Sequence, residues 1–162
     1  MSLTQRHANW LILLTFVMAL ILSTLPLPAW VAPYRPEWVP LVLLYWNLAL
    51  PQRVGVGYGW MLGLLLDVIK GTLLGMHALA LTVIAYVAVK LHRRIRVYPL
   101  WQQSFTVLIL VAFIQFFVLW IKGIIGEGPT TWRYWLPTLT SALIWPWLFV
   151  ILRDLRRRFR VT

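Results

Sequence analysis

Six apolar segments follow one another along the chain, separated by short stretches that carry charges, prolines or glycines. Helix-stopping residues, such as Pro26 and Pro51, close several of them. A helix that crosses a bilayer needs about 20 apolar residues, so the segments predict transmembrane helices, and the brief second segment is the weakest of these predictions. The expected spans are about 10–27, 36–50, 54–69, 72–91, 101–121 and 135–152, all within one polytopic membrane domain of residues 1–162.

The composition agrees with this pattern. Hydrophobic residues make up 61% of the 162 positions and charged residues only 12%, with a mean hydropathy of +0.79. A soluble domain carries about 25% charged residues. We therefore expect an all-α integral membrane protein built as a six-transmembrane-helix bundle. Because the chain has no cysteine, disulfides and cysteine-ligated metals are excluded, and no cofactor is expected.

The basic residues predict the orientation of this bundle. With six spans both termini lie on one side, and that side carries eleven of the fifteen Lys and Arg residues. These are Arg6, Arg53, Lys90, Arg93, Arg94, Arg96, Arg153, Arg156, Arg157, Arg158 and Arg160. The remaining four are Arg35, Lys70, Lys122 and Arg133. The positive-inside rule makes the basic side cytoplasmic, so the net charge of +11 reflects topology and anionic lipids rather than nucleic acid.

Small residues recur every four positions in the third segment and beyond it. The series is Gly55, Gly59, Gly63, Gly71 and Gly75, with Asp67 in the equivalent place. Positions four apart share one helix face, and in membranes small residues on such a face let another backbone approach closely. The stripe is either a docking face for a partner helix or a seam inside the chain's own bundle, and each alternative can hold for part of it. Gly71 and Gly75 can also belong to a turn.

Asp67 is the only acidic residue well inside an apolar stretch, which makes it a functional candidate. Lys70, one turn away, and Arg35, in the preceding outer loop, are its candidate ion-pair partners. The plainer alternative is an ordinary ion pair near the outer interface. His77 on the next helix can also lie close, as a hydrogen-bonded packing residue, and Asn47 is expected to bond to a neighbouring helix.

The stretch between the first two segments reads WVAPYRPEW, and its aromatic residues are typical of the headgroup level. No enzyme signature accompanies it. The sequence has no HExxH motif and no phosphate-binding glycine loop, and Ser23, Ser104 and Ser141 lack the glycine-flanked setting of an intramembrane protease. We therefore expect a protein that is not an enzyme.

Several motifs together resemble one family over essentially the whole chain. They are YRPEWVPLVLLYWNLALP (34–51), RVGVGYGWMLGLLLDVIKGTLLG (53–75), ALTVIAY (80–86), LWQQ (100–103), and WPW followed by a basic tail. The RP-x-W element followed by G-x-x-x-G-x-x-x-D-x-x-x-G is the most specific part. In this combination the chain resembles the rod shape-determining MreD family of Gram-negative bacteria.

This resemblance implies a non-enzymatic inner-membrane subunit of the rod or elongation complex. Family members work with the bitopic protein MreC and link cytoplasmic MreB filaments to peptidoglycan synthesis by RodA and its class B penicillin-binding protein; RodZ is a further member of the complex. The family fold is similar to the substrate-binding subunits of energy-coupling-factor transporters. The alternative function is a small-molecule or lipid-binding membrane carrier, which needs a polar cavity.

The candidate site residues follow from these arguments. The hypothesis for partner docking places a transmembrane helix of MreC on Gly55, Gly59 and Gly63. Its outer end is then fixed by Asp67 and by Tyr34, Arg35, Pro36, Glu37 and Trp38. Two basic clusters, Lys90–Arg96 and Arg153–Arg160, either contact lipid headgroups and cytoplasmic partners or serve as topology signals alone.

Overall fold

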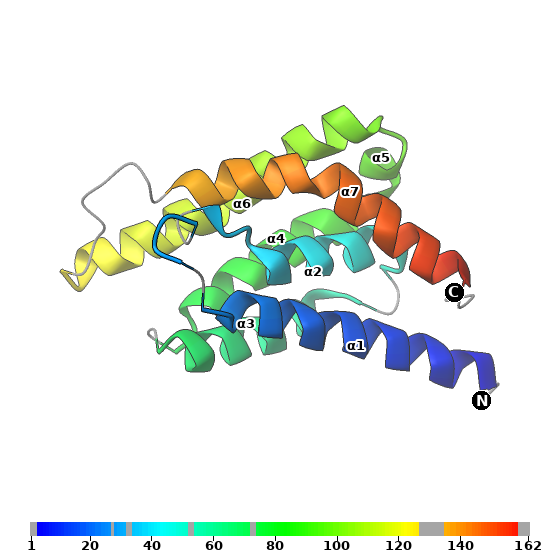
Figure 1. The fold of residues 1–162 in the computed structure, drawn as a ribbon, viewed down its shortest axis with the longest axis horizontal. Coiled ribbons are helices and arrows are strands. Elements are labelled where there is room, and N and C mark those ends of the chain that lie inside the picture. Colours follow the sequence, from blue (N-terminus) through cyan, green and yellow to red (C-terminus); the bar gives the residue numbers. More distant parts are fainter. Residues whose placement is uncertain are drawn as a thin grey trace.

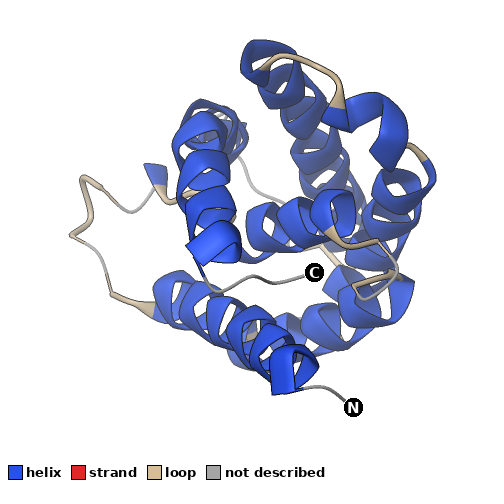
Figure 2. Cartoon of the chain, turned by 90° about the vertical axis from the view of Figure 1, so that its right-hand side faces the viewer, coloured by secondary structure: helices blue, strands red, loops and turns tan. Residues whose placement is uncertain are grey.

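The computed structural model of the protein describes residues 3–26, 28–31, 34–51, 54–71, 74–126 and 135–158, with side chains from residue 9 onward. Within these ranges the chain forms seven helices and no strand. They are α1 (Leu3–Thr24), α2 (Trp38–Ala49), α3 (Val56–Lys70), α4 (Met76–Lys90), α5 (His92–Arg96), α6 (Leu100–Ile124) and α7 (Leu136–Arg158). The helices run along one another as a bundle, with both termini and α5 at one end (Figure 1). Figure 2 looks onto that end.

Each of the six apolar segments contains a helix, but hydropathy misplaced some of the ends. Helix α1 begins at Leu3, before the apolar run, and α7 continues through the basic tail to Arg158. Arginine and lysine are good helix formers, so a helix continues past the point where hydrophobicity stops. The short helix α5 was not expected at all, and it buries Ile95 within the basic cluster.

Proline and glycine residues determine several helix ends and one helix bend. Helix α2 ends just before Pro51, as expected. Gly71 ends α3 and Gly75 precedes α4, with φ angles of 65° and 99°, which confirms that these two glycines form a turn. Pro146 lies inside α7, and Figure 1 shows that helix changing direction about midway along its length, because a proline removes a backbone donor and bends a helix.

Helix α2 is the centre of the bundle. Every residue from Val39 to Leu48 is buried, and the helix packs against α1, α4, α5 and α7. Its 12 residues extend about 18 Å, less than the ~30 Å of a bilayer's hydrocarbon core. A short helix is tolerated here because neighbouring helices surround it. The indole nitrogen Nε1 of Trp46 donates to Thr15 Oγ1 at 2.9 Å, which ties α2 to α1.

Helix α6 is apolar on its outward face and largely apolar on its inward face. Its inward side buries Val107, Val111 and Val118, while large apolar residues cover its outward side. The exposed residues are Trp101, Phe105, Ile109, Phe113, Phe116, Trp120 and Ile124. The same outward apolar surface continues on α1, α3, α4 and α7. Soluble monomers rarely expose apolar patches of this extent, so lipid is the natural surrounding of this surface.

By length and composition alone, α6 and α7 are each long and apolar enough to cross a bilayer. Shorter apolar helices cover Asn9–Thr24, Trp38–Ala49 and Met76–Lys90. The described part of the chain is thus helical throughout its regular structure, and two of its helices have the length and composition of membrane spans.

Candidate functional site

The glycine stripe lies against helix α4 of the same chain. A Cβ atom built on Gly63 would stand 2.2 Å from Ala78 Cα and 2.4 Å from its nitrogen. On Gly59 it would stand 2.8 Å from the carbonyl oxygen of Leu81. Both glycines are buried, and α3 and α4 form the most extensive helix pair in the bundle. The missing side chains thus let these two backbones come into direct contact.

This contact corrects part of the docking hypothesis. Gly59 and Gly63 cannot receive a helix of MreC in this arrangement, because α4 already occupies their face. The alternative of a seam inside the bundle describes them. Gly55 differs, since it precedes α3 and a Cβ there would meet only the Pro51 carbonyl at 3.9 Å. Its part in docking stays a prediction.

Asp67 holds the beginning of helix α4. Its carboxylate accepts hydrogen bonds from the backbone nitrogens of Gly75 at 2.8 Å and His77 at 3.0 Å. The ring nitrogen Nδ1 of His77 lies 2.8 Å from Asp67 Oδ1. The first N–H groups of a helix have no partner within the helix, and they form the positive end of its dipole. A carboxylate therefore stabilises them both by accepting their hydrogen bonds and by its negative charge. Asp67 is only 1% exposed and therefore joins α3 to α4 from inside.

The ion-pair partners expected for Asp67 are engaged elsewhere. Lys70 Nζ lies 3.8 Å from Glu37 Oε2. Arg35 donates from Nη1 to the Ser23 carbonyl oxygen at 2.6 Å and from Nη2 to the carbonyl oxygen of Leu25. Arg35 thus supplies a positive charge at the carboxyl end of α1, where the last carbonyls lack helical partners. Lys70 and Arg35 thus contact other groups, whereas the expected proximity of His77 to Asp67 is confirmed.

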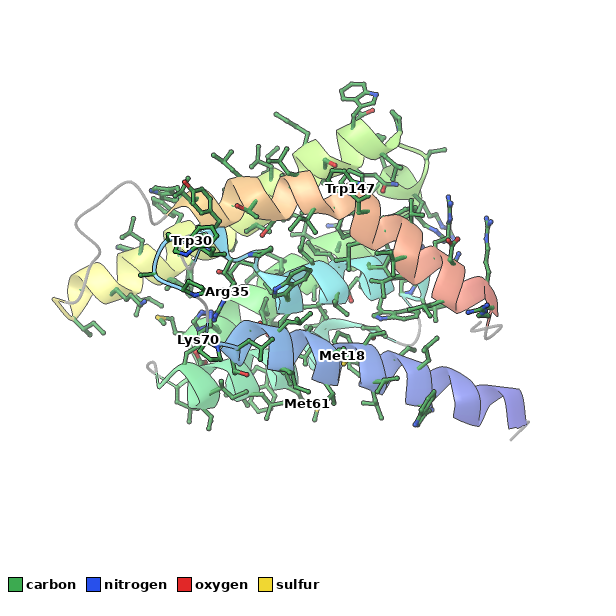
Figure 3. All side chains as sticks on the ribbon, in the orientation of Figure 1. Met18, Trp30, Arg35, Met61, Lys70 and Trp147 are labelled. Atoms are coloured by element: carbon green, nitrogen blue, oxygen red, sulfur yellow. The ribbon has the colours of Figure 1, made fainter. Side chains whose placement is uncertain are left out.

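Glu37 connects three helices at the same end of the bundle. Its Oε1 accepts a hydrogen bond from Gln115 Nε2 of α6 at 2.9 Å, and its Oε2 faces Lys70 of α3. Its backbone nitrogen donates to Ser141 Oγ of α7 at 2.9 Å. In Figure 3, Arg35 and Lys70 both lie toward the end of the bundle that is away from the termini. We call Arg35, Glu37, Lys70, Gln115 and Ser141 the outer polar junction.

The outer polar junction uses the polar residues of the predicted docking loop for internal bonds. Tyr34, by contrast, keeps 54% of its surface exposed, and Trp30 keeps 79%. Pro36 and Trp38 are half-buried. The aromatic residues of this loop, rather than its charges, are thus free to meet lipid or a partner.

The described basic residues of the two predicted clusters lie at the end of the bundle that carries the termini (Figure 1). They are Lys90, Arg93, Arg94, Arg96, Arg153, Arg156, Arg157 and Arg158. Arg160, Arg53, Arg133 and Glu127 lie outside the described residues, as does the side chain of Arg6. Glu37, Lys70 and Arg35 lie at the opposite end, so the two ends differ in charge as the sequence predicted.

An apolar groove lies between α1 and α7, which sequence reasoning did not find. It measures about 420 Å³, with α2 as its floor. Its walls include Leu14 and Met18 of α1 and Ile151 of α7, and Trp38 and Val42 line the floor. Helices α1 and α7 each pack against α2 without packing extensively against each other. No sequence signal could reveal this groove, because it depends on which helices become neighbours. We call it the α1/α7 groove.

The carrier alternative needs a polar cavity around Asp67, His77, Asn47 or Gln115, and none of these residues lines the α1/α7 groove. Asn47 is fully buried, and neither its Oδ1 nor its Nδ2 has a partner among the described residues, so its expected bond to a neighbouring helix was wrong. In the same ranges no three His, Asp or Glu residues gather to hold a metal ion.

Over its described residues the chain is a helical bundle with apolar outward faces, and these features are typical of an α-helical membrane protein. The family model for the rod shape-determining protein MreD matches residues 4–155. The chain is also 35% identical over 159 residues to the rod shape-determining protein MreD of Haemophilus influenzae, covering 98% of each chain. The chain therefore belongs to the MreD family of rod shape-determining proteins, and the resemblance seen in the motifs is confirmed. No solved structure matches it.

Proposed function

We propose that this chain is a non-enzymatic, multi-pass subunit of the bacterial inner membrane that binds MreC within the rod or elongation complex. Through MreC it helps to couple MreB filaments to peptidoglycan synthesis by RodA and its class B penicillin-binding protein, with RodZ as a further member of the complex. Membership of the MreD family supports a role in cell shape. The observation that carries MreC binding is the α1/α7 groove.

The proposed topology has six spans and cytoplasmic termini. Three features support it: both termini lie at one end, the basic clusters gather there, and α5 returns the chain to that end (Figure 2). Short spans such as α2 and α3 are compatible with a bilayer when neighbouring helices cover them or the bilayer thins locally. A fold similar to the substrate-binding subunits of energy-coupling-factor transporters is part of the same proposal.

The α1/α7 groove suits a transmembrane helix better than a polar ligand. Thr15 is the only hydroxyl residue on its wall, and its oxygen already bonds to the carbonyl oxygen of Ile12 and to Trp46. An apolar occupant therefore leaves the Thr15 hydroxyl satisfied. From Trp10 to Leu22 the groove follows α1 for about 18 Å, several turns of a helix. Because lipid tails are as apolar as leucine, a partner helix gains through close packing, which a preformed groove provides.

Filling the groove tests this proposal. Met18→Trp enlarges a groove side chain that is 51% exposed, so the substitution leaves the core undisturbed. Met61→Trp makes the same change on α3, where Met61 is 62% exposed and does not line the groove. We expect Met18→Trp to reduce co-purification of MreC severalfold and Met61→Trp to leave it unchanged. Equal recovery of MreC with both variants would remove the groove from the docking role.

A further inference from the structure

A second cavity lies at the basic end of the bundle, separate from the α1/α7 groove. It measures about 190 Å³, roughly six times the ~30 Å³ that one water molecule occupies in the liquid. Helices α2, α5 and α7 line it. Its lining consists of Tyr45, Leu48, Ala49, Arg96, Phe149 and Arg156. One side of the cavity is thus apolar, and the other carries two guanidinium groups and a phenol.

Tyr45 contributes a buried hydroxyl that lacks a partner. The residue is 1% exposed, and its oxygen makes no hydrogen bond within the described chain. Its ring is held by edge contacts, with centroid distances of 5.1 Å to Trp46 and 5.5 Å to Phe149. Buried hydroxyls in folded proteins are nearly always bonded, so one that is fixed in place and unpaired on a cavity wall indicates a missing partner.

The two arginines of this cavity also lack a counter-charge. The ion pairs among the described residues involve Glu37, Asp67 and Asp154, and none of them reaches Arg96 or Arg156. Their helices approach from different parts of the chain, so the fold brings the two guanidinium groups to one cavity. Arginine presents several N–H donors in a planar fork that matches phosphate oxygens.

We propose that this cavity binds a phosphate group through Arg96, Arg156 and the hydroxyl of Tyr45. The phosphate belongs either to the headgroup of an anionic phospholipid in the adjacent leaflet or to free phosphate, and the apolar side of the cavity suits the lipid. The proposal concerns a ligand at the basic end and is independent of MreC binding. It goes beyond general attraction of the basic clusters to lipid, because it assigns the contact to three residues.

Lipid binding to the purified full-length protein in detergent tests this assignment. Native mass spectrometry would follow titration with phosphatidylglycerol, and with phosphatidylcholine as the zwitterionic comparison. Variants Arg96→Gln and Arg156→Gln each remove one cavity charge. Arg94→Gln is the matched control, because Arg94 is exposed on the same short helix and does not line the cavity. Tyr45→Phe removes only the hydroxyl.

We expect Arg96→Gln and Arg156→Gln to weaken phosphatidylglycerol binding about tenfold each, as loss of a charge-assisted hydrogen bond implies, and Arg94→Gln to weaken it less than twofold. Tyr45→Phe should weaken it severalfold while leaving the melting temperature without lipid at or above that of the unmodified chain. Displacement of the lipid by millimolar inorganic phosphate would identify free phosphate as a ligand, and no displacement would identify the headgroup. Equal loss with Arg94→Gln, or no loss with the cavity variants, would overturn the proposal.

Discussion

The contact between Gly63 and helix α4 gives the sharpest prediction about stability. In Gly63→Ala the new methyl carbon would stand 2.2 Å from Ala78 Cα and 2.7 Å from the carbonyl carbon of His77. These are backbone atoms, so no side chain can rotate away. To lengthen the contact to an ordinary 3.4 Å, the two helices must separate by about 1.2 Å.

The size of the effect follows from that displacement. A gap of 0.5–1 Å already forfeits about a quarter to a half of the dispersion attraction between facing atoms. Forced expansion of a packed interface typically costs ~1–3 kcal/mol. Alanine regains up to about 1 kcal/mol over glycine as a helix former, which offsets part of this loss. We therefore expect Gly63→Ala to lower the free energy of unfolding by about 2 kcal/mol.

Two further glycines of the same region calibrate this prediction. At Gly57 the added methyl group meets nothing within 4 Å, so Gly57→Ala should be neutral or slightly stabilising. At Gly59 the closest atom is the Leu81 carbonyl oxygen at 2.8 Å, so Gly59→Ala should fall between the two. Reversible unfolding by sodium dodecyl sulfate in mixed micelles, followed by circular dichroism, measures all three. If Gly63→Ala unfolds at the same detergent fraction as Gly57→Ala, the close approach of α3 and α4 is refuted.

Two other predictions concern Asp67 at the beginning of α4 and the Glu37–Gln115 hydrogen bond. Asp67→Asn should lower the free energy of unfolding by about 1–3 kcal/mol, because a neutral amide binds the first N–H groups of α4 less well than a carboxylate; Asp154→Asn, whose side chain is 67% exposed, should have almost no effect in the same unfolding assay. In a double-mutant cycle, Glu37→Gln and Gln115→Leu should show a coupling energy of about 0.5–3 kcal/mol, since their side chains bond at 2.9 Å, and strict additivity would contradict that bond.

The sequence predicted the helical class and the family, but it did not show which helix lies at the centre of the bundle. Helix α2 looked like the weakest span because it is short, but it is the centre of the bundle, where Val39–Leu48 are all buried. Hydropathy cannot separate an apolar residue that faces protein from one that faces lipid, since both environments favour the same side chains. Hydropathy also gave no indication of α5, because that helix has a single buried isoleucine, Ile95, among charged residues.

The sequence indicated some contacts of the candidate site, but not those that depend on the tertiary arrangement. The four-residue spacing of Gly59 and Gly63 indicated a close backbone approach, and the structure supplies it. The spacing could not name the approaching helix, and the neighbour proved to be α4. The proximity of Asp67 and His77 followed from their place on consecutive helices, but the bonds to the backbone of α4 depend on the turn between them. The α1/α7 groove arises only from the tertiary arrangement.

Site-specific photo-crosslinking in living cells tests the central claim most directly, namely that the α1/α7 groove receives MreC. Probes at Leu14, Met18 and Ile151 line the groove and are 41%, 51% and 57% exposed. Probes at Leu65 and Val68 on α3, 47% and 69% exposed, lie outside it. The account predicts strong crosslinks to MreC from the groove positions and background levels from α3. Crosslinks to MreC that arise from α3, with none from the groove, would contradict it.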